Sequence, residues 1–460
     1  MKSLKTLYPF FTSILWSCCS LTAIPTANGL GDPIYVEVST ENSLFPLYLT
    51  PMVYEKAMLD TAYLKQLENV IAFDLNHNGF TSLIKNTPAG AENGFDSFGD
   101  IGKLTQQGIL YIVKTQVVGK ELQLRALIAK EKLMKSASPI TLTGDLAQDR
   151  RAIHGMMDAL NKTLFEVDGI ASTKIIYSVK EKTPPSHLTG ISEIWEADYD
   201  GANAHPLTKV RSFSVMPAAI PPKSGFTSGG FLYTSYRNGQ AKIYAATYKD
   251  GVGKRVIQLK GNQLMPAISL QRDKIAFISD VMGNPDLFLQ PFTPEGGAVG
   301  KPFQIFSAKQ ATQSSPTFSP DGKRIAFVSD KDGAPRVYVI DIPAPGVSLI
   351  QIKPTLLTKV NRESSAPSWS PDGKMIAYCS RTGGERQIWV YDYNTHAEKQ
   401  VTFGPGNKEN PSWAPNSLHL VYNASDKNGC DLFITHINGG DPIRITEGLG
   451  EKRFPNWIPK

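Results

Sequence analysis

Cysteine is scarce in this sequence. The 460 residues include four cysteines, of which Cys18 and Cys19 lie near the amino-terminus. The other two, Cys379 and Cys430, are too few for a disulfide framework. One disulfide bond between them is the alternative, but two separate thiols at strand edges are the favoured interpretation. The fold must therefore rest on apolar cores, and the chain is long enough for two or more domains.

A strong excess of one charge sign and a second long apolar run are also missing. Lysine and arginine number 48 against 42 acidic residues, so the net charge is +6. The basic residues form no stripe, which argues against nucleic acid as a partner. After residue 27 no apolar run is long enough to span a bilayer.

Motifs of common hydrolases and metal sites are absent as well. No G-x-S-x-G nucleophile elbow occurs, since GFTSGG from Gly225 has the wrong spacing, and the seven histidines form no H-x-x-x-H pair. Residues 74–79, DLNHNG, match the first half of a calcium loop, but Lys85 stands where the bidentate glutamate is needed. They are interpreted as a helix end with a turn, and His154 as a packed or capping histidine. We expect no catalytic residue, no metal and no cofactor.

The first 27 residues have the layout of a secretory signal peptide. Lys2 and Lys5 precede an apolar stretch, and small residues follow near Ala23 and Ala27. Cleavage near either alanine predicts an exported protein. A lipoprotein cleavage site at Cys18 is the alternative, against which the bulky neighbour Trp16 argues.

Repetition is the strongest feature that the sequence does have. A phrase of proline, an aromatic or apolar residue, a turn and a short apolar run recurs at gaps of 49, 50, 51, 44 and 44 residues. A second phrase of alternating apolar residues follows it, at an offset of 20 residues in four cases out of five. The first phrase begins at Pro217, Pro266, Pro316, Pro367, Pro411 and Pro455.

Each repeat predicts four strands joined by turns. The SPDG segments at Ser319–Gly322 and Ser370–Gly373 are tight turns, because proline presets one backbone angle and Asp-Gly tolerates a positive one. A four-stranded sheet of this length cannot bury both faces alone, whereas several arranged radially can. The repeats therefore predict a β-propeller.

The last repeat stops early. Complete units have apolar residues nine to eleven positions after the proline, yet the chain ends five positions after Pro455. If Ser172 follows Lys460 in space, Ile175, Ile176 and Tyr177 occupy the missing positions. We therefore expect six blades in residues 169–460, one of them built from both ends of the domain, which leaves no free lateral edge.

Residues 28–168 do not repeat and predict a small α/β domain. DPIYVEVST (32–40) alternates like a strand, and residues 54–74 have helical periodicity. Two strands flank a turn at Gly119 and Lys120. A second helix covers residues 145–169, with Gly169 as its expected stop.

The repeated aspartates and aromatic residues could have a function, but their positions in the repeat favour a structural role. Asp321 and Asp372 lie in turns that shape the blades. Aromatic residues share one position of the repeat, where packing between blades is expected, because stacking on sugars would require exposure. They are Phe318, Trp369, Trp413 and Trp457.

The loops that precede the innermost strands meet at one mouth of the channel and are the expected partner-binding site. Loops on a rigid scaffold commonly carry recognition, and mixed charge with a few apolar side chains suits a protein partner. Solvated turns without function are the alternative, and a metal bound at the axis is a further one. The candidate residues are Gln263, Met265, Ser314, Ser315, Glu363, Ser364, Ser365, Glu409, Asn410, Arg453 and Phe454.

The sequence resembles the TolB family, the periplasmic components of the Tol-Pal system of Gram-negative bacteria. The resemblance covers nearly the whole mature chain, including the six repeats closed by RFPNWIPK. Its most specific stretches are IAFDLNHNGF (71–80), HGMMDALNKTLFEVDGIASTKIIYS (154–178) and EIWEADYDGANAHPLT (193–208). The sequence departs from the family where PPKSGFTSGG and SLQRDK replace SPDG in blades two and three, and its amino-terminal domain matches loosely.

The resemblance implies a periplasmic, non-enzymatic and monomeric scaffold that supports outer-membrane integrity and constriction during cell division. The propeller mouth would bind the peptidoglycan-associated lipoprotein Pal. A segment after the signal peptide would contact TolA; it comprises Asp32, Pro33, Ile34, Tyr35, Val36, Glu37 and Val38. An exported propeller enzyme or lectin acting on cell-wall glycans is one alternative. An adaptor for a different lipoprotein is another.

Overall fold

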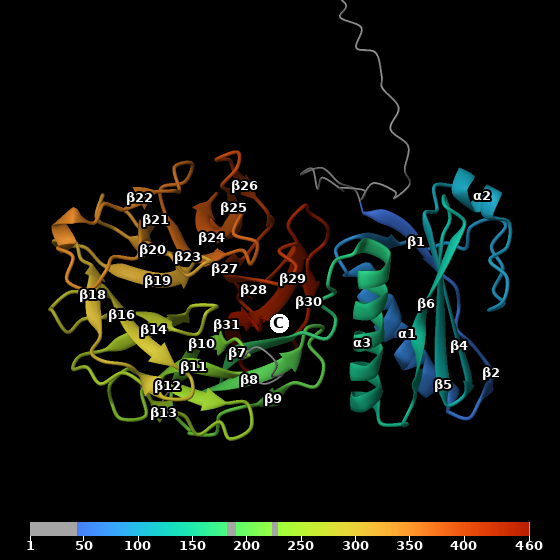
Figure 1. The fold of residues 1–460 in the computed structure, drawn as a ribbon, viewed down its shortest axis with the longest axis horizontal. Coiled ribbons are helices and arrows are strands. Elements are labelled where there is room, and N and C mark those ends of the chain that lie inside the picture. Colours follow the sequence, from blue (N-terminus) through green and yellow to red (C-terminus); the bar gives the residue numbers. More distant parts are fainter. Residues whose placement is uncertain (1–43, 182–189, 223–228, 460) are drawn as a thin grey trace, which may run out of the picture. The chain divides into compact units, whose positions relative to one another are not determined.

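The computed structural model describes residues 44–181, 190–222 and 229–459 (Figure 1). Within these ranges no helix is both long and apolar enough to cross a membrane. The expected signal peptide (1–27), the expected strand at residues 32–40, the expected arm at 32–38 and residues 223–228 of the blade-two insertion lie outside the described residues.

The first region is a mixed sheet with helices. The strand order is β3-β1-β4-β5-β6, and β2 also pairs with β4. Helices α1 and α3 pack against each other, and α3 packs against β6 (Figure 1). The elements are β1 (Phe45–Leu49), β2 (Val53–Ala57), α1 (Thr61–Asn76), β3 (Thr81–Leu83), α2 (Ile101–Gln106), β4 (Tyr111–Gly119), β5 (Glu121–Ile128), β6 (Leu133–Thr141) and α3 (Leu146–Phe165).

Side-chain caps fix where the two long helices begin. The Asp60 carboxylate accepts a hydrogen bond from the backbone N–H of Tyr63 at 3.1 Å, and Asp145 caps α3 in the same way. The expected helix over residues 54–74 is therefore wrong at its start, because residues 53–57 pair with β4 as a strand. The expected stop at Gly169 is also wrong, because α3 ends at Phe165 and Glu166 takes the left-handed conformation at φ 61°.

Six blades form the propeller, five with four strands and blade three with a fifth strand, and we number them from the blade that joins both chain ends. Blade one is β31-β7-β8-β9, and blades two to six follow in sequence. The blade-one strands are β31 (Glu451–Trp457), β7 (Lys174–Lys180), β8 (Ser192–Asp198) and β9 (His205–Pro206). Blades two and three contain β10 (Ser214–Ile220), β11 (Gly230–Ser235), β12 (Lys242–Thr247), β13 (Lys254–Arg255), β14 (Gln263–Ile268), β15 (Lys274–Ser279), β16 (Asp286–Thr293), β17 (Gly297–Ala298) and β18 (Phe303–Phe306).

Blades four to six repeat the same plan. Blade four contains β19 (Gln313–Phe318), β20 (Arg324–Ser329), β21 (Arg336–Asp341) and β22 (Thr355–Leu356), with a 3-10 turn η1 (Leu349–Gln351) before the last strand. Blades five and six contain β23 (Ser364–Trp369), β24 (Met375–Thr382), β25 (Glu385–Asp392), β26 (Glu398–Gln400), β27 (Asn407–Trp413), β28 (His419–Asp426), β29 (Gly429–His436) and β30 (Ile443–Arg444).

The expected closure of the ring is confirmed. Strand β31 pairs antiparallel with β7, and Asn456 and Trp457 lie opposite Ile176 and Ile175. The two ends of the propeller thus share one sheet. Blade one therefore has four strands, as do the neighbouring blades two and six.

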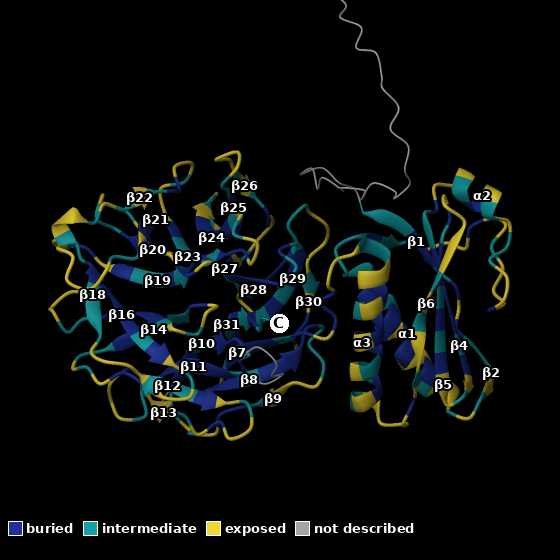
Figure 2. Ribbon diagram, viewed as in Figure 1, coloured by how far each residue is buried: buried dark blue, intermediate teal, exposed yellow. Residues whose placement is uncertain are grey.

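The second and third strands of the blades are largely buried, whereas many of the connecting loops are exposed (Figure 2). One apolar cluster is continuous from α1 and α3 to blades one and six, and it includes Leu67, Ile153, Tyr199, Val421 and Trp457. Residues 42–460 form one unit of contacts, so the division between residues 168 and 169 stays a prediction.

Both later cysteines are free and buried, in β24 and β29, which confirms the interpretation as two separate thiols. Burial raises the pKa of Cys379 to about 12 and that of Cys430 to about 11. Neither thiol is therefore a reactive thiolate at neutral pH.

Candidate functional site

All six innermost strands carry the same irregularity where they line the channel. The register of each shifts at the proline of the repeat and the residue before it, which form a β-bulge. Proline has no N–H, so the bulge costs no hydrogen bond at that position. The residues before the prolines have φ between 48° and 55°; they are Met216, Met265, Ser315, Ala366, Asn410 and Phe454.

This left-handed conformation is uncommon for residues other than glycine and costs on the order of 1 kcal/mol each. None of the six is β-branched, which matches the steric demand of a positive φ. The paired strand on either side of the bulge holds the conformation in place. The six bulges thus present six variable side chains on one fixed backbone frame.

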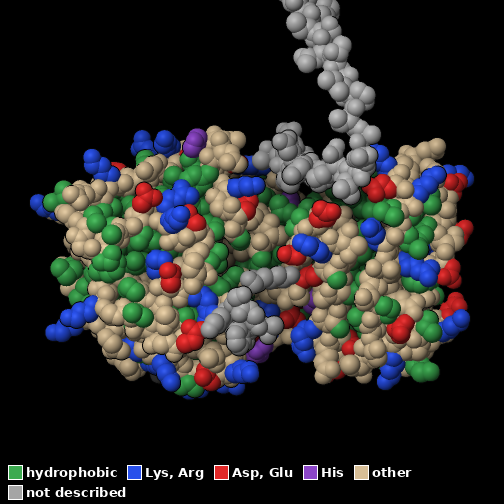
Figure 3. All heavy atoms as spheres, in the orientation of Figure 1, with side chains coloured by type: hydrophobic (Ala, Val, Ile, Leu, Met, Phe, Trp, Pro, Cys, Tyr) green, Lys and Arg blue, Asp and Glu red, His purple; other side chains and the backbone are tan. Residues whose placement is uncertain are grey.

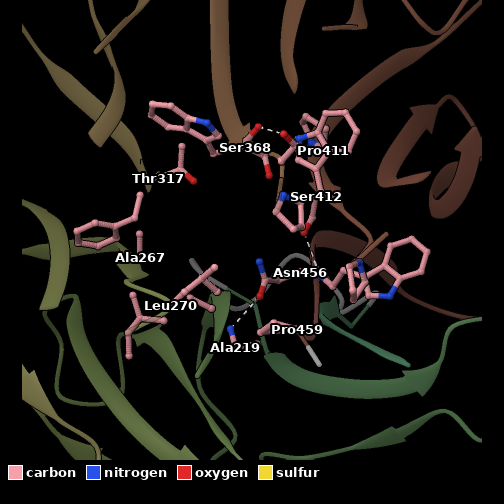
Figure 4. Close-up of a pocket in the computed structure, with 18 of the residues that line it drawn as sticks. Ala219, Ala267, Leu270, Thr317, Ser368, Pro411, Ser412, Asn456 and Pro459 are labelled. Atoms are coloured by element: carbon pink, nitrogen blue, oxygen red, sulfur yellow. Dashed lines mark hydrogen bonds between the residues drawn. The ribbon is translucent and has the colours of Figure 1, made fainter. Parts of the chain in front are cut away.

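The channel encloses about 750 Å³. Its wall contains the six bulge residues, the six prolines and the six residues that follow them. Figure 4 shows members of the last set, Ala267, Thr317, Ser368, Ser412 and Asn456, arranged around an open space.

The wall of the channel consists mainly of hydroxyl, amide and apolar groups. Among the described residues that line the channel, the charged ones are Asp168 and Asp372, and none is histidine, cysteine, lysine or arginine. The hydroxyl and amide groups of the lining can form hydrogen bonds with a ligand, and its apolar surface can pack against one.

Hydrogen bonds between neighbouring blades fix the wall. The Asn456 Oδ1 atom accepts from the Ala219 backbone N–H at 2.8 Å, and the Trp457 N–H donates to Ser412 Oγ at 3.0 Å (Figure 4). The Trp413 indole donates to the Ser368 carbonyl at 2.9 Å. A wall held by such bonds is preorganised for a partner.

The expected structural roles of the repeated aromatic and acidic residues are confirmed. The four aromatic side chains at the shared position are 3 to 8% exposed, so they pack between blades and offer no open stacking platform. Asp321 accepts from the Ser319 hydroxyl and the Lys323 N–H, which closes the turn. The Ser319 hydrogen bond is also the main reason that the pKa of Asp321 is lowered.

The structure distributes the predicted mouth residues over three environments. Met265, Ser315, Asn410 and Phe454 line the channel at the bulges. Gln263 and Ser364 are 0 and 2% exposed, and their side chains hold the blades by bonding to the Leu259 carbonyl and to the Ser380 hydroxyl. Half-buried or exposed at the start of the inner strands are Ser314, Glu363, Ser365, Glu409 and Arg453.

Charged pairs connect blades five, six and one at this mouth. The Glu409 carboxylate of blade six accepts from Arg386 of blade five and lies 3.6 Å from Arg453 of blade one. Glu363 pairs with Arg381 at 3.0 Å, and both side chains are 52% exposed. Glu409 therefore links blades, whereas Glu363 is open to a partner.

The loops that lead into the inner strands also expose apolar side chains. Val360, Phe403 and Leu449 are 62, 69 and 89% exposed, and they precede the inner strands of blades five, six and one. They share the mouth with the charged pairs, because each loop ends where an inner strand begins. Figure 3 shows the charged side chains of both signs interspersed over the face in view, with no basic stripe there.

Met216 and Ala366 are not among the predicted site residues, although both line the channel at bulges. Their position before a repeat proline was the available signal. Asn456 was also missed, because its bond to blade two depends on the closure of the ring.

Comparisons with known proteins agree with this architecture. Residues 162–460 match the family model described as TolB beta propeller domain. A protein from Protochlamydia amoebophila named Protein TolB homolog is 54% identical over 421 residues, which cover 88% of this chain and 89% of that protein. A Chlamydia trachomatis protein of the same name is 36% identical over 405 residues, covering 87% of this chain and 85% of its own length.

A solved structure supports the fold alone, because its sequence is distant. The crystal structure of TolB from Acinetobacter baumannii has a TM-score of 0.72 at 22% identity, and it covers 91% of this chain and 98% of that one. The sequence matches decide the family. The chain belongs to the TolB family.

Proposed function

We propose that this protein is a periplasmic, non-enzymatic scaffold of the Tol-Pal system that binds the peptidoglycan-associated lipoprotein Pal at the propeller mouth. Its role would be to maintain outer-membrane integrity and constriction during cell division. Family membership supports the system, and the channel lining, which consists mainly of hydroxyl, amide and apolar groups, supports binding of a partner.

One observation supports the channel mouth at the start of the inner strands as the binding site: exposed apolar and charged side chains lie together there. Three loops expose apolar side chains there, and the Glu363–Arg381 pair lies on the same rim. Apolar anchors within a polar rim are typical of protein interfaces. At the other end, Val167, Asp168 and Gly169, which join α3 to β7, border the channel.

The proposed Pal site therefore comprises the bulge residues and the exposed rim. Gln263 and Ser364 contribute to the blade backbone and not to the contact surface. Residues 32–38 would contact TolA, which rests on the family resemblance, since they lie outside the described residues.

The glycan-binding alternative is less well supported. Sugar recognition commonly uses exposed aromatic faces, whereas Trp369, Trp413 and Trp457 are 3 to 6% exposed. No observation on the described residues favours it over a protein partner.

The test is binding of the purified chain to purified Pal, measured by isothermal titration calorimetry. We expect Glu363→Lys to weaken binding about tenfold, or about 1.4 kcal/mol, because it reverses a rim charge. The folded state should be little affected, since exposed ion pairs contribute roughly 0–1 kcal/mol. Glu409 is a poorer choice, because its reversal would also break the links between three blades.

Asp441→Lys is the matched control. Asp441 is exposed in the loop between β29 and β30, which lies at the opposite end of the strands. Equal affinities for wild type and Glu363→Lys would move the site away from this mouth. A pull-down from envelope extract that recovers a different lipoprotein would keep the scaffold and change the partner.

A further inference from the structure

A buried polar cluster lies where α3 meets blade one, apart from the channel. His154 of α3 is 1% exposed, and the side chains of Asp198 and Asp200 are nearly as buried. Among the described residues these three form the group whose potential ligand atoms all lie within 4.8 Å of one another. Asp198 and Asp200 lie 44 and 46 positions after His154 (198 minus 154, 200 minus 154), so no short sequence motif contains all three residues.

The imidazole of His154 is oriented by an acidic residue behind it. Its Nδ1 atom lies 2.8 Å from Asp74 Oδ2, and the Tyr199 hydroxyl donates to Asp74 Oδ1 at 2.6 Å. With Nδ1 paired to this carboxylate, Nε2 is the imidazole nitrogen that is available as a ligand. Metal-binding histidines are typically held by a carboxylate in this way.

The other nitrogen points into the acidic group. Nε2 of His154 is buried without a hydrogen-bond partner, and it lies 3.6 Å from Asp200 Oδ2. A buried polar atom without a partner is costly, so its retention calls for an explanation. A ligand between His154 and the two aspartates would supply the missing interaction.

The charge balance also favours a cation. Asp74, Asp198 and Asp200 bring three carboxylates together, and the Arg150 guanidinium, which contacts Asp200, is the cationic side chain in direct contact with them. The Arg150 side chain is 18% exposed; its Nη2 atom contacts Asp200, and its buried Nε atom has no hydrogen-bond partner. A cation that binds Asp200 would therefore compete with Arg150 for this carboxylate.

We propose that His154, Asp198 and Asp200 bind one Zn²⁺ ion, with water as the fourth ligand and Arg150 as the competing cation. One imidazole nitrogen with two carboxylate oxygens is a donor set that suits Zn²⁺, whereas Ca²⁺ prefers oxygen ligands alone. Bonds of about 2.0–2.1 Å place tetrahedral ligand atoms about 3.3 Å apart. The 3.6 Å between His154 Nε2 and Asp200 Oδ2 is close to this value.

The bound ion would join the amino-terminal region to the propeller. His154 lies on α3, while Asp198 ends β8 and Asp200 lies in the turn after it. Coordination would link these elements directly, at the blade that closes the ring. The proposal departs from the expectation of no metal site that the sequence alone supports.

The experiment titrates the purified full chain with Zn²⁺ alone, by isothermal titration calorimetry and by thermal denaturation. We expect one site per chain and a higher Tm with Zn²⁺, since a ligand that binds the folded state stabilises it. Asp198→Asn should weaken binding at least about tenfold and lose the Tm shift. Arg150→Gln should bind Zn²⁺ several-fold more tightly, because the competing cation is gone.

Two controls separate this site from others. Asp441→Asn changes an exposed acid elsewhere and should bind as the wild type does. His436→Gln changes a buried histidine in β29 of blade six, outside the proposed ligand set, and should also leave the affinity unchanged. Visible absorption of bound Co²⁺ in the wild type, lost in Asp198→Asn, reports the tetrahedral geometry even if a variant is less stable.

Four outcomes would overturn the proposal. They are the absence of saturable Zn²⁺ binding, equal affinity in wild type and Asp198→Asn, tighter binding of Ca²⁺ than of Zn²⁺, and loss of the site in His436→Gln. None depends on Pal, so failure here leaves the proposed scaffold role as it stands.

Discussion

Five interfaces between blades differ from the sixth. Blades one to six meet in pairs through separate apolar clusters, each with residues of two neighbours, such as Phe306 and Phe327 between blades three and four. The interface between blades six and one has no cluster of its own. Its residues Val421, Leu432, Ile175 and Trp457 belong to the cluster that includes α1 and α3.

This difference identifies what the amino-terminal region adds to the ring. The five ordinary interfaces need only the repeat, because each blade covers its neighbour. The sixth interface lies beside the blade assembled from both chain ends, where the ring is closed by strand pairing. We call the interface between blades six and one the seam. Helices α1 and α3 enlarge the apolar core there, so a mutation at the seam should destabilise the protein more than a mutation at another interface.

Deleting residues 454–460 should have the largest effect. The deletion removes most of β31 and the 3% exposed Trp457, whose indole donates to Thr173 Oγ1 at 2.8 Å. Losing a buried tryptophan costs about 3–5 kcal/mol, and the broken closure adds to it. We expect a loss of at least about 5 kcal/mol in chemical denaturation, which is comparable to the stability of a whole domain.

Leu449→Ser is the control for this deletion, because Leu449 lies in the loop just before β31 and its side chain is 89% exposed. An unchanged unfolding transition after the deletion would show that β31 does not close the ring. A separate early transition for the amino-terminal region would show that the seam couples the two regions less than its shared core indicates.

Acid should weaken the same seam. His77 at the end of α1 and His419 and His436 in blade six are close together, with the rings of the latter two 5.1 Å apart. Burial lowers the pKa of His77 and His436 to about 4, and burial, followed by the nearby His436 and His77, lowers the pKa of His419 well below its usual value. Lys399 lowers that of His436 further.

The sign of the effect follows from proton binding. The buried histidines stay neutral in the folded state, whereas in the unfolded chain they bind protons below their unfolded pKa of about 6.5. Their contribution to folding stability is therefore complete above that pH and is lost as the pH falls toward 4. The loss is on the order of 2 kcal/mol per histidine by pH 4. Urea denaturation from pH 7.5 to 4.5 should show it, with a smaller slope in His436→Gln and the wild-type slope in the exposed control His205→Gln. A flat profile would contradict the buried neutral state.

The fold of the repeated blades could be predicted from the sequence more fully than the fold of the amino-terminal region. The blades recur in sequence, so their turns, their aromatic positions and the opposition of Asn456 and Ile176 could be predicted by counting. The amino-terminal region has no repeat to count. Residues 54–57 fit a helical periodicity but belong to β2, because the strand is fixed by non-local pairing with β4, which periodicity over a few residues cannot reveal.

The candidate sites divide in the same way. The channel residues follow from their position before the repeat prolines. By contrast, His154 meets Asp198 and Asp200, and His77 meets blade six, only because the helices pack against the propeller. No local spacing encodes such contacts, since they depend on tertiary structure.

The smallest predicted effect concerns an ordinary interface. Trp413→Phe at the interface of blades five and six should cost about 1 kcal/mol, because it removes the hydrogen bond to the Ser368 carbonyl and a little buried area. Blade four already has Phe318 at this position, so the fold accommodates the smaller ring. Trp457→Phe makes the same change at the seam, and its cost in urea denaturation should be larger, because the indole there anchors β31 to Thr173. Equal costs for the two variants would mean that the seam is one interface among six, and that the helices add core without adding strength to the closure.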